Sequence, residues 1–166
     1  MSVRRSGGTP ATVALAHAGV TFREHAYEHD PSHPSFGLEA AAALGVDAAC
    51  VFKTLLVAGP DGTLAVGIVP VESQLDLKAF AAAIGVKRVT MADPAVAERT
   101  TGYVRGGISP IGQKRPLVTF LGASALRHDS IFVSGGRRGF EIELTAGDLL
   151  RVTDGSSAEI ATRLPR

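Results

Sequence analysis

Residues 50–58 read Cys50-Val51-Phe52-Lys53-Thr54-Leu55-Leu56-Val57-Ala58, and the rest of the chain can be arranged around them. Apolar, β-branched and aromatic residues ended by the turn Gly59-Pro60-Asp61-Gly62 predict a short, buried β-strand. Alternate side chains of a strand share a face, so Lys53 points the same way as Leu55 and Val57. An unpaired buried ammonium costs free energy, and burial depresses a lysine pKa. Either Lys53 reaches solvent along its stem, or it is held at a site that needs a cation.

The bulk composition is that of one soluble domain. The chain has 166 residues, of which 45% are hydrophobic and 20% charged. Its single cysteine, Cys50, excludes an internal disulfide framework and fits a reducing compartment. We see neither a signal peptide nor an apolar run long enough to span a membrane, and we expect a cytoplasmic protein. The net charge of +1 means that any attraction for nucleic acid must come from local patches or from a partner.

Short helices and strands alternate irregularly on both sides of the central strand. We expect a loose arm over residues 1–8 and one domain over residues 9–166. Within the domain we expect helices over 11–18, 38–44, 77–84, 93–102, 146–152 and 156–163, and strands over 20–28, 50–58, 64–70, 86–91, 117–121, 130–133 and 140–144. Hairpins are expected across residues 59–62 and across the connection 134–139. This order predicts a single α/β domain with a mixed, largely antiparallel, barrel-like sheet.

A glycine-rich stretch, residues 102–115, excludes regular structure. Gly107-Ile-Ser-Pro-Ile-Gly112 has the spacing of a phosphate loop, but Gln113 follows where such a loop has lysine. No GxGxxG motif occurs, so the sequence predicts neither a triphosphate nor a dinucleotide site. Consecutive glycines let a backbone approach a ligand and aim its N–H groups at an oxygen. A plain surface loop is the alternative, and we favour a ligand-binding loop.

Other reactive side chains give weaker signals. His25, His29 and His33 lie on a predicted strand and in a proline-containing loop, so we expect no metal site. Cys50 is either a nucleophile or a small packed residue, and its apolar neighbours favour packing. Basic pairs are solvated charges by default, but two adjoin glycine-rich turns where a phosphate backbone can lie. The residues concerned are Lys114, Arg137 and Arg138.

Several uncommon strings occur together and carry a resemblance. They are Tyr27-Glu28-His29-Asp30-Pro31, Phe36-Gly37, Phe52-Lys53-Thr54-Leu55-Leu56-Val57, Gln74-Leu75-Asp76-Leu77-Lys78, Met91-Ala92-Asp93, Thr101-Gly102-Tyr103, Gly106-Gly107-Ile108-Ser109-Pro110-Ile111-Gly112-Gln113-Lys114 and Val133-Ser134-Gly135-Gly136-Arg137-Arg138-Gly139. In this order, from about Thr9 to Arg163, the chain resembles the YbaK/EbsC family of aminoacyl-tRNA deacylases. The resemblance is greatest to the branch that acts on Cys-tRNA(Pro). This family is related to the editing domain of bacterial prolyl-tRNA synthetases.

The resemblance implies a trans-editing hydrolase that preserves translation fidelity without a cofactor. It implies a catalytic role for the lysine at Lys53 and for the loop glycines Gly106, Gly107 and Gly112. It implies a substrate pocket that includes Tyr27, Phe36, Thr54, Ile108, Ser109, Pro110, Ser134 and, in place of an expected aspartate, Glu141. The acceptor end of tRNA is the implied partner, and the near-neutral charge suggests that prolyl-tRNA synthetase supplies tRNA selectivity.

The residues alone support chemistry of this kind. An aminoacyl ester is already reactive, and we see no Ser-His-Asp or Cys-His arrangement, so no covalent intermediate is required. Water would attack, or the substrate's own thiol, which would make the release lyase-like. Two rival functions remain: a non-catalytic module that binds the tRNA acceptor or a synthetase, and an enzyme that uses Lys53 as a Schiff base, for example with pyridoxal phosphate.

Overall fold

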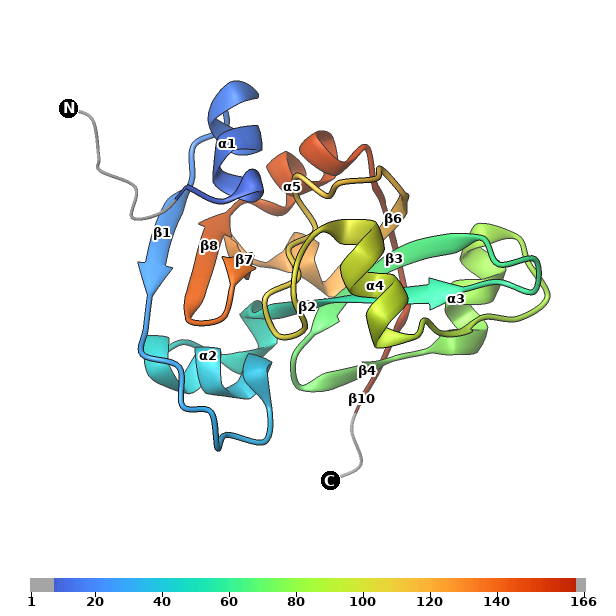
Figure 1. The fold of residues 1–166 in the computed structure, drawn as a ribbon, viewed down its shortest axis with the longest axis horizontal. Helices are drawn as coiled ribbons and strands as arrows, with labels where there is room; N and C mark the ends of the chain where they lie inside the picture. Colours follow the sequence, from blue (N-terminus) through green and yellow to red (C-terminus); the bar gives the residue numbers. More distant parts are fainter. Residues whose placement is uncertain (1–7, 164–166) are drawn as a thin grey trace.

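The computed structural model describes residues 8–163, which form three β-sheets and five α-helices (Figure 1). The predicted arm over residues 1–8 lies almost wholly outside the described residues. The helices are α1 (Pro10–His17), α2 (Phe36–Leu44), α3 (Leu77–Ile84), α4 (Pro94–Thr101) and α5 (Ala146–Thr153). There are also two 3₁₀ turns: η1 (Ala48–Cys50) follows α2, and η2 (Ala123–Arg127) connects two strands. No helix of the described residues is long and apolar enough to cross a membrane.

The five-stranded sheet has the order β5-β2-β3-β6-β9, and its pairings are both antiparallel and parallel. Its strands are β2 (Phe52–Ala58), β3 (Leu64–Pro70), β5 (Thr90–Met91), β6 (Val118–Gly122) and β9 (Ser156–Ala158). A second sheet is wholly antiparallel, with the order β1-β8-β7, and contains β1 (Arg23–Ala26), β7 (Ile131–Arg137) and β8 (Phe140–Leu144). The third pairs β4 (Ser73–Leu75) with β10 (Ala161–Arg163). The sheets do not close into a barrel, but the mixed α/β class predicted from the sequence is confirmed.

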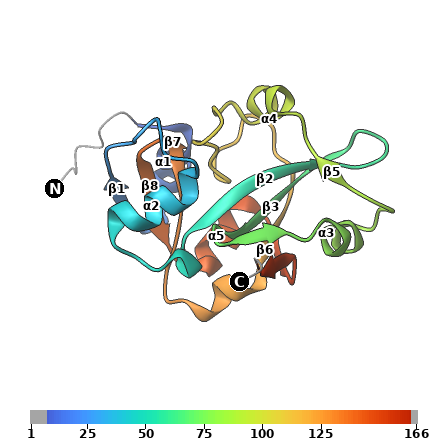
Figure 2. The same ribbon diagram turned by 90° about the horizontal axis from the view of Figure 1, so that it is seen from below.

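The predicted central strand is β2, and it pairs with β3 as the expected hairpin. The turn closes with a 2.8 Å hydrogen bond from the amide of Gly59 to the carbonyl of Thr63. Lys53 lies opposite Val69 in the antiparallel register. The hairpin crosses the middle of the molecule, with α2 and the sheet β1-β8-β7 at one end and α3 at the other (Figure 2). A parallel bridge between Val51 and Phe132 joins the start of β2 to β7.

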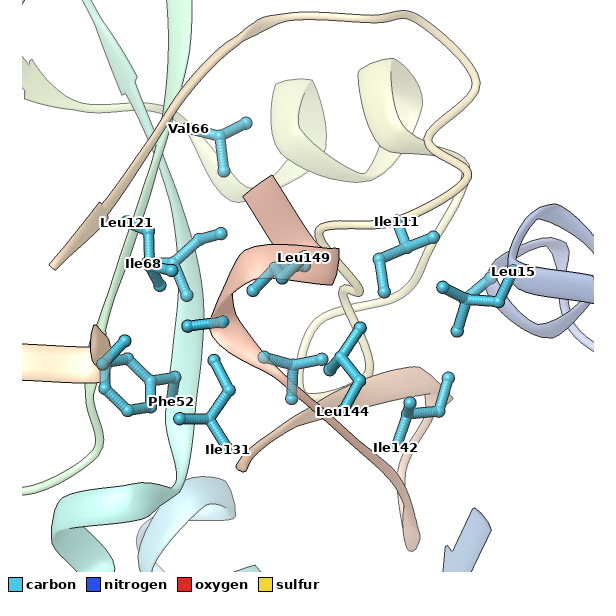
Figure 3. Packing of buried hydrophobic residues seen from close by; sticks show 14 of the residues in the cluster. Leu15, Phe52, Val66, Ile68, Ile111, Leu121, Ile131, Ile142, Leu144 and Leu149 are labelled. Carbon is cyan, nitrogen blue, oxygen red and sulfur yellow. The ribbon is translucent and has the colours of Figure 1, made fainter. Parts of the chain in front are cut away.

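The largest hydrophobic cluster lies between the five-stranded and three-stranded sheets (Figure 3). Val66, Ile68 and Leu121 face it from one sheet, and Ile131, Ile142 and Leu144 face it from the other. Helix α5 adds Leu149, and α1 adds Leu15. The glycine-rich stretch contributes Ile111, of which only 1% is exposed, so this loop is anchored in the core.

Three predicted elements were wrong. Residues 156–163 form β9 and β10 rather than a helix, because β9 pairs with β6 and β10 pairs with β4. The strand predicted over 86–91 is reduced to Thr90–Met91. The connection predicted over 134–139 is mostly strand, since β7 continues to Arg137 with a bulge between Ser134 and Arg137.

Candidate active site

A cavity of about 550 Å³ opens beside β2. Its walls come from the residues before and at the start of α2, from β2, from the segment that leads into α4, from the glycine-rich stretch and from β7–β8. Predicted site residues on the wall are Tyr27, Phe36, Lys53, Thr54, Gly106, Ile108, Ser134 and Glu141. This volume lies within the range of about 300–1,000 Å³ that is typical of small-ligand sites.

Lys53 is half-buried on the cavity wall. Removal from water, which disfavours the charged form, lowers the pKa of its ammonium below the ordinary value. Among residues 8–163, no carboxylate forms an ion pair with it. The ammonium therefore carries a charge that the surrounding protein does not neutralise, beside an open cavity.

Thr54 and Ser134 add hydroxyl groups to the same wall. The Thr54 Oγ1 atom is buried and has no hydrogen-bond partner in the described part of the chain. A buried hydroxyl without a partner costs about 1–3 kcal/mol. The Ser134 hydroxyl accepts a 3.2 Å hydrogen bond from the amide of Gly136. Thr54 thus offers an unused donor and acceptor, whereas Ser134 is partly engaged.

Glu141 lies on β8, opposite Ser134 on one side and His25 on the other, and 7% of it is exposed. Burial raises the pKa of its carboxyl to about 8. Burial also raises the pKa of Tyr27 to about 12, and the neighbouring carboxyls of Glu141 and Glu39 add to that effect. At neutral pH the site therefore contains a protonated phenol and a carboxyl group that is mostly neutral.

Gly106 and Phe36 form one edge of the cavity. The backbone of Gly106 has a φ of +86°, a conformation that favours glycine. A Cβ atom there would lie 2.8 Å from the Phe36 ring and 2.9 Å from Nε of Arg138. Only glycine allows the main chain to pass so close to the ring.

Apart from Gly106 and Ile108, the residues predicted in the glycine-rich loop do not line the cavity. The Gly107 amide donates to the carbonyl of Val104 at 2.8 Å, so it is already used. The Gly112 backbone lies against the start of α1, where a Cβ would be 2.5 Å from the carbonyl oxygen of Pro10. Ser109 and Pro110 are buried and are not among the residues that line the cavity. These four positions hold the loop in place, and the catalytic role predicted for Gly107 and Gly112 and the substrate-binding role predicted for Ser109 and Pro110 stay predictions.

The predicted tRNA-contacting residues separate into different surroundings. Arg138 is exposed, and its guanidinium lies over the Phe36 ring at 5.1 Å from the ring centre. Arg137 instead stacks at 4.4 Å over Phe140, a core residue. Lys114 is exposed and lies away from the cavity wall. Of the three, Arg138 is placed at the cavity edge.

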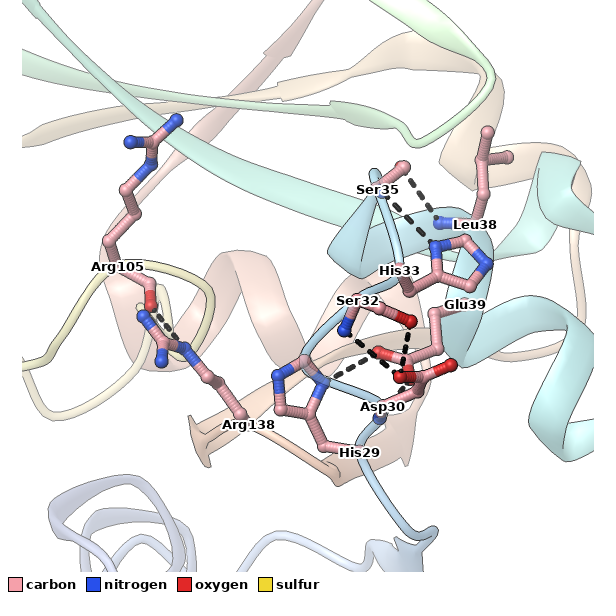
Figure 4. A network of polar contacts seen from close by, with 9 residues as sticks. All are labelled: His29, Asp30, Ser32, His33, Ser35, Leu38, Glu39, Arg105 and Arg138. Carbon is pink, nitrogen blue, oxygen red and sulfur yellow. Dashed lines mark hydrogen bonds and ion pairs between the residues drawn. The ribbon is translucent and has the colours of Figure 1, made fainter.

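The histidine cluster has contacts of its own (Figure 4). His29 Nδ1 is 2.8 Å from a carboxylate oxygen of Glu39, and His25 Nε2 is 2.9 Å from Glu143. Within residues 8–163, no group of three or more histidine, cysteine or acidic side chains is arranged to hold a metal ion. Cys50 donates through Sγ to the carbonyl of Asp47 at 3.0 Å, and burial raises the pKa of its thiol.

Comparison with known proteins shows the family to which the chain belongs. The sequence model described as the aminoacyl-tRNA editing domain matches residues 35–152. EbsC of Enterococcus faecalis, named as a candidate Cys-tRNA(Pro)/Cys-tRNA(Cys) deacylase, is 39% identical over 144 residues, which cover 87% of each chain. The chain belongs to the aminoacyl-tRNA editing domain family.

Solved structures show that the fold of this editing domain is shared. A candidate trans-editing enzyme for prolyl-tRNA synthetase superposes with a TM-score of 0.78 at 24% identity, over 92% of this chain and 95% of the other. Hypothetical protein APE2540 superposes with a TM-score of 0.82 at 23% identity, over 93% of this chain and 100% of the other. The predicted YbaK-like fold is thereby confirmed.

The editing domain also has cavity residues that sequence reasoning missed. The clearest is Arg105, which lines the cavity immediately before Gly106. Its place in the glycine-rich stretch was a usable signal, but a single arginine outside a basic pair did not stand out. Pro34, Ser35 and Met91 also line the cavity. Their side chains carry no sequence pattern that indicates a site.

Proposed function

We propose that this protein is a trans-editing aminoacyl-tRNA deacylase that hydrolyses the ester of mischarged tRNA, with Cys-tRNA(Pro) as its substrate. The observation that carries the proposal is the half-buried Lys53 ammonium, unpaired among the described residues, on the wall of a cavity in an editing-domain fold. The 39% identity to EbsC supports the same substrate class.

The chemistry follows from the charges in the cavity. The ester carbonyl gains negative charge as a nucleophile attacks it, and a cation already in place stabilises that charge without reorganisation. We assign this role to Lys53, with Gly106 supplying main chain close to the substrate. Water attacks the carbonyl carbon, and the ribose oxygen leaves; with a cysteinyl substrate, its own thiol can attack instead.

Selection among aminoacyl groups rests on the cavity walls. Tyr27 and Phe36 are rigid rings on the wall, and Ile108 is an apolar side chain near them. A small acyl group enters between them, and a larger one meets these walls. One methylene changes selectivity by only about 1–3 kcal/mol, so size alone gives modest discrimination. The Thr54 hydroxyl and the Glu141 carboxyl add polar contacts to the aminoacyl group, including its α-amino group.

The partners proposed are the acceptor end of tRNA and, for tRNA selectivity, prolyl-tRNA synthetase. The net charge of +1 leaves little general attraction for a polyanion. A synthetase that already holds its tRNA would supply the missing affinity and the selectivity for that tRNA.

Hydrolysis of Cys-tRNA(Pro), Ala-tRNA(Pro) and Pro-tRNA(Pro) by the purified protein tests the proposal. We expect Cys-tRNA(Pro) to be deacylated fastest and Lys53→Ala to reduce its turnover by about 10²–10³-fold, the range for loss of one stabilising donor. Lys78→Ala, which removes an exposed lysine from α3, is the matched control. Undiminished turnover by Lys53→Ala contradicts the assignment of the site. Binding of tRNA without hydrolysis by the wild type favours the non-catalytic module instead.

A further inference from the structure

The cavity edge carries two arginines whose guanidinium groups form no ion pair with a carboxylate in the described part of the chain. Arg105 and Arg138 are both exposed, and Arg105 lines the cavity. The nearest acid in the contacts of Arg105 is Glu98, and its carboxylate accepts from the Arg105 main-chain amide at 2.8 Å.

The main chain beneath these two side chains is held at a fixed position. The carbonyl of Arg105 accepts a 2.8 Å hydrogen bond from Nε of Arg138, while its amide is bound to Glu98. Arg138 also lies over the Phe36 ring, and Gly106 leaves room for both. Figure 4 shows the Arg105 and Arg138 side chains on one side, opposite the loop that carries His29, His33 and Ser35. The hydrogen bond uses one N–H of Arg138 and leaves its terminal nitrogens for a ligand.

The chemistry of the proposed substrate says what these cations meet. An aminoacyl ester has no free carboxylate, so the anionic groups of the substrate are its phosphodiesters. The phosphate on the 5′ side of the terminal ribose is only a few bonds from the ester. When the ester lies inside the cavity beside Lys53, the last phosphates of the strand therefore lie at its edge. Arginine suits them because its planar fork donates two hydrogen bonds to phosphate oxygens.

We infer that Arg105 and Arg138 form a clamp for the last phosphodiester groups at the single-stranded 3′ end of the tRNA, an inference that rests on the proposed function. Arg105 is then a substrate-positioning residue. The clamp reads no base, since phosphate contacts position a nucleic acid without reporting its sequence. It draws the ester to a fixed depth in the cavity.

Two substrates with the same aminoacyl group test the clamp: the aminoacyl-tRNA, and the 3′-O-aminoacyl ester of adenosine, which has no phosphate. We expect Arg105→Ala and Arg138→Ala each to raise KM for the tRNA about tenfold relative to the adenosine ester, as removal of a charge-assisted hydrogen bond predicts. The salt dependence of KM for tRNA should also fall by about 0.7 in log–log slope for each phosphate that the variant no longer binds. Arg105→Lys, which keeps the charge, should recover part of the affinity.

Arg127→Ala is the charge-matched control, because Arg127 is exposed and lines a separate cavity. This variant should leave KM unchanged for both substrates. Equal losses on tRNA and on the adenosine ester, or an unchanged salt slope, would overturn the clamp. A wild-type protein that hydrolyses neither substrate would instead overturn the proposed function, so the two failures are distinguishable.

Discussion

Burial of the Glu141 carboxyl makes the stability of this protein fall as pH rises, which is opposite to the effect of an acid whose pKa is lowered by folding. Its pKa is raised from 4.5 to about 8, so between these two pH values the folded state holds a proton that the unfolded chain has released. Where the folded state binds more protons, the free energy of unfolding falls as pH rises. The contribution of Glu141 is therefore complete below about pH 4.5 and is lost as the pH rises through about 8.

The magnitude follows from the same two values. One pKa unit corresponds to about 1.36 kcal/mol, so a rise from 4.5 to about 8 corresponds to about 5 kcal/mol between the ends of the window. Glu141→Gln keeps the shape and polarity of the side chain but cannot ionise. The variant should match the wild type in stability near pH 4.5 and exceed it by several kcal/mol above pH 8.

Urea unfolding of both proteins between pH 4.5 and 9 measures this difference directly. Groups other than Glu141 titrate in both proteins, so their contributions cancel in the difference between the two free energies. Tyr27, the neighbouring phenol, stays protonated throughout because its pKa is about 12. A difference in stability that stays constant across the window refutes the reasoning, since it means that Glu141 is ionised in the folded state as readily as in the unfolded chain.

Two further predictions concern Thr54 on the cavity wall and Gly112 in the glycine-rich loop. Thr54→Val removes a buried hydroxyl that has no hydrogen-bond partner among the described residues. The midpoint of thermal unfolding should therefore stay level or rise, while the rate of deacylation falls. A fall in both the unfolding midpoint and the deacylation rate would contradict an unsatisfied hydroxyl that binds substrate. Gly112→Ala should lower the free energy of unfolding by more than Gly45→Ala does, by about 1–3 kcal/mol for overpacking. Both glycines have a φ of +67°, but only at Gly112 would a Cβ meet backbone atoms. Urea unfolding measures the two variants. If both lose the same free energy of unfolding, the contact with α1 is relieved without cost, which contradicts the prediction.

Local signals in the sequence predicted much of the fold. The hairpin β2–β3 follows from two apolar runs separated by Gly59-Pro60-Asp61-Gly62. Helix α3 has its predicted bounds because the Asp76 side chain caps its first turn and Gly85 ends it in a left-handed conformation. In these elements the residues that decide the structure lie within a few positions of one another, so no tertiary information is needed.

Long-range pairing explains the elements that could not be predicted. Residues 156–163 have a composition compatible with a helix, but β9 completes the edge of one sheet beside β6, and β10 pairs with β4 about 90 residues earlier. The candidate site likewise has residues that local signals predict and residues whose surroundings depend on long-range contacts. Lys53 and Gly106 were found from local pattern and resemblance, whereas the separation of Arg137 from Arg138 depends on which ring each guanidinium meets across the fold.

The glycine-rich stretch is both a piece of the core and a wall of the cavity, and this double role supports a preorganised site. Ile111 is buried in the main cluster, and the Tyr103 hydroxyl donates to its carbonyl at 2.7 Å. The Gln113 side chain donates to the carbonyl of Ser109 at 3.0 Å, so the loop is hydrogen-bonded to itself as well. At its other end, Gly106 faces the cavity against Phe36. A main chain fixed by the core does not have to be ordered by the substrate, and dipoles that need no reorganisation are those that stabilise developing charge most effectively. We therefore propose that the glycines that do not line the cavity contribute to catalysis indirectly, because their close contacts hold the position of Gly106, which does.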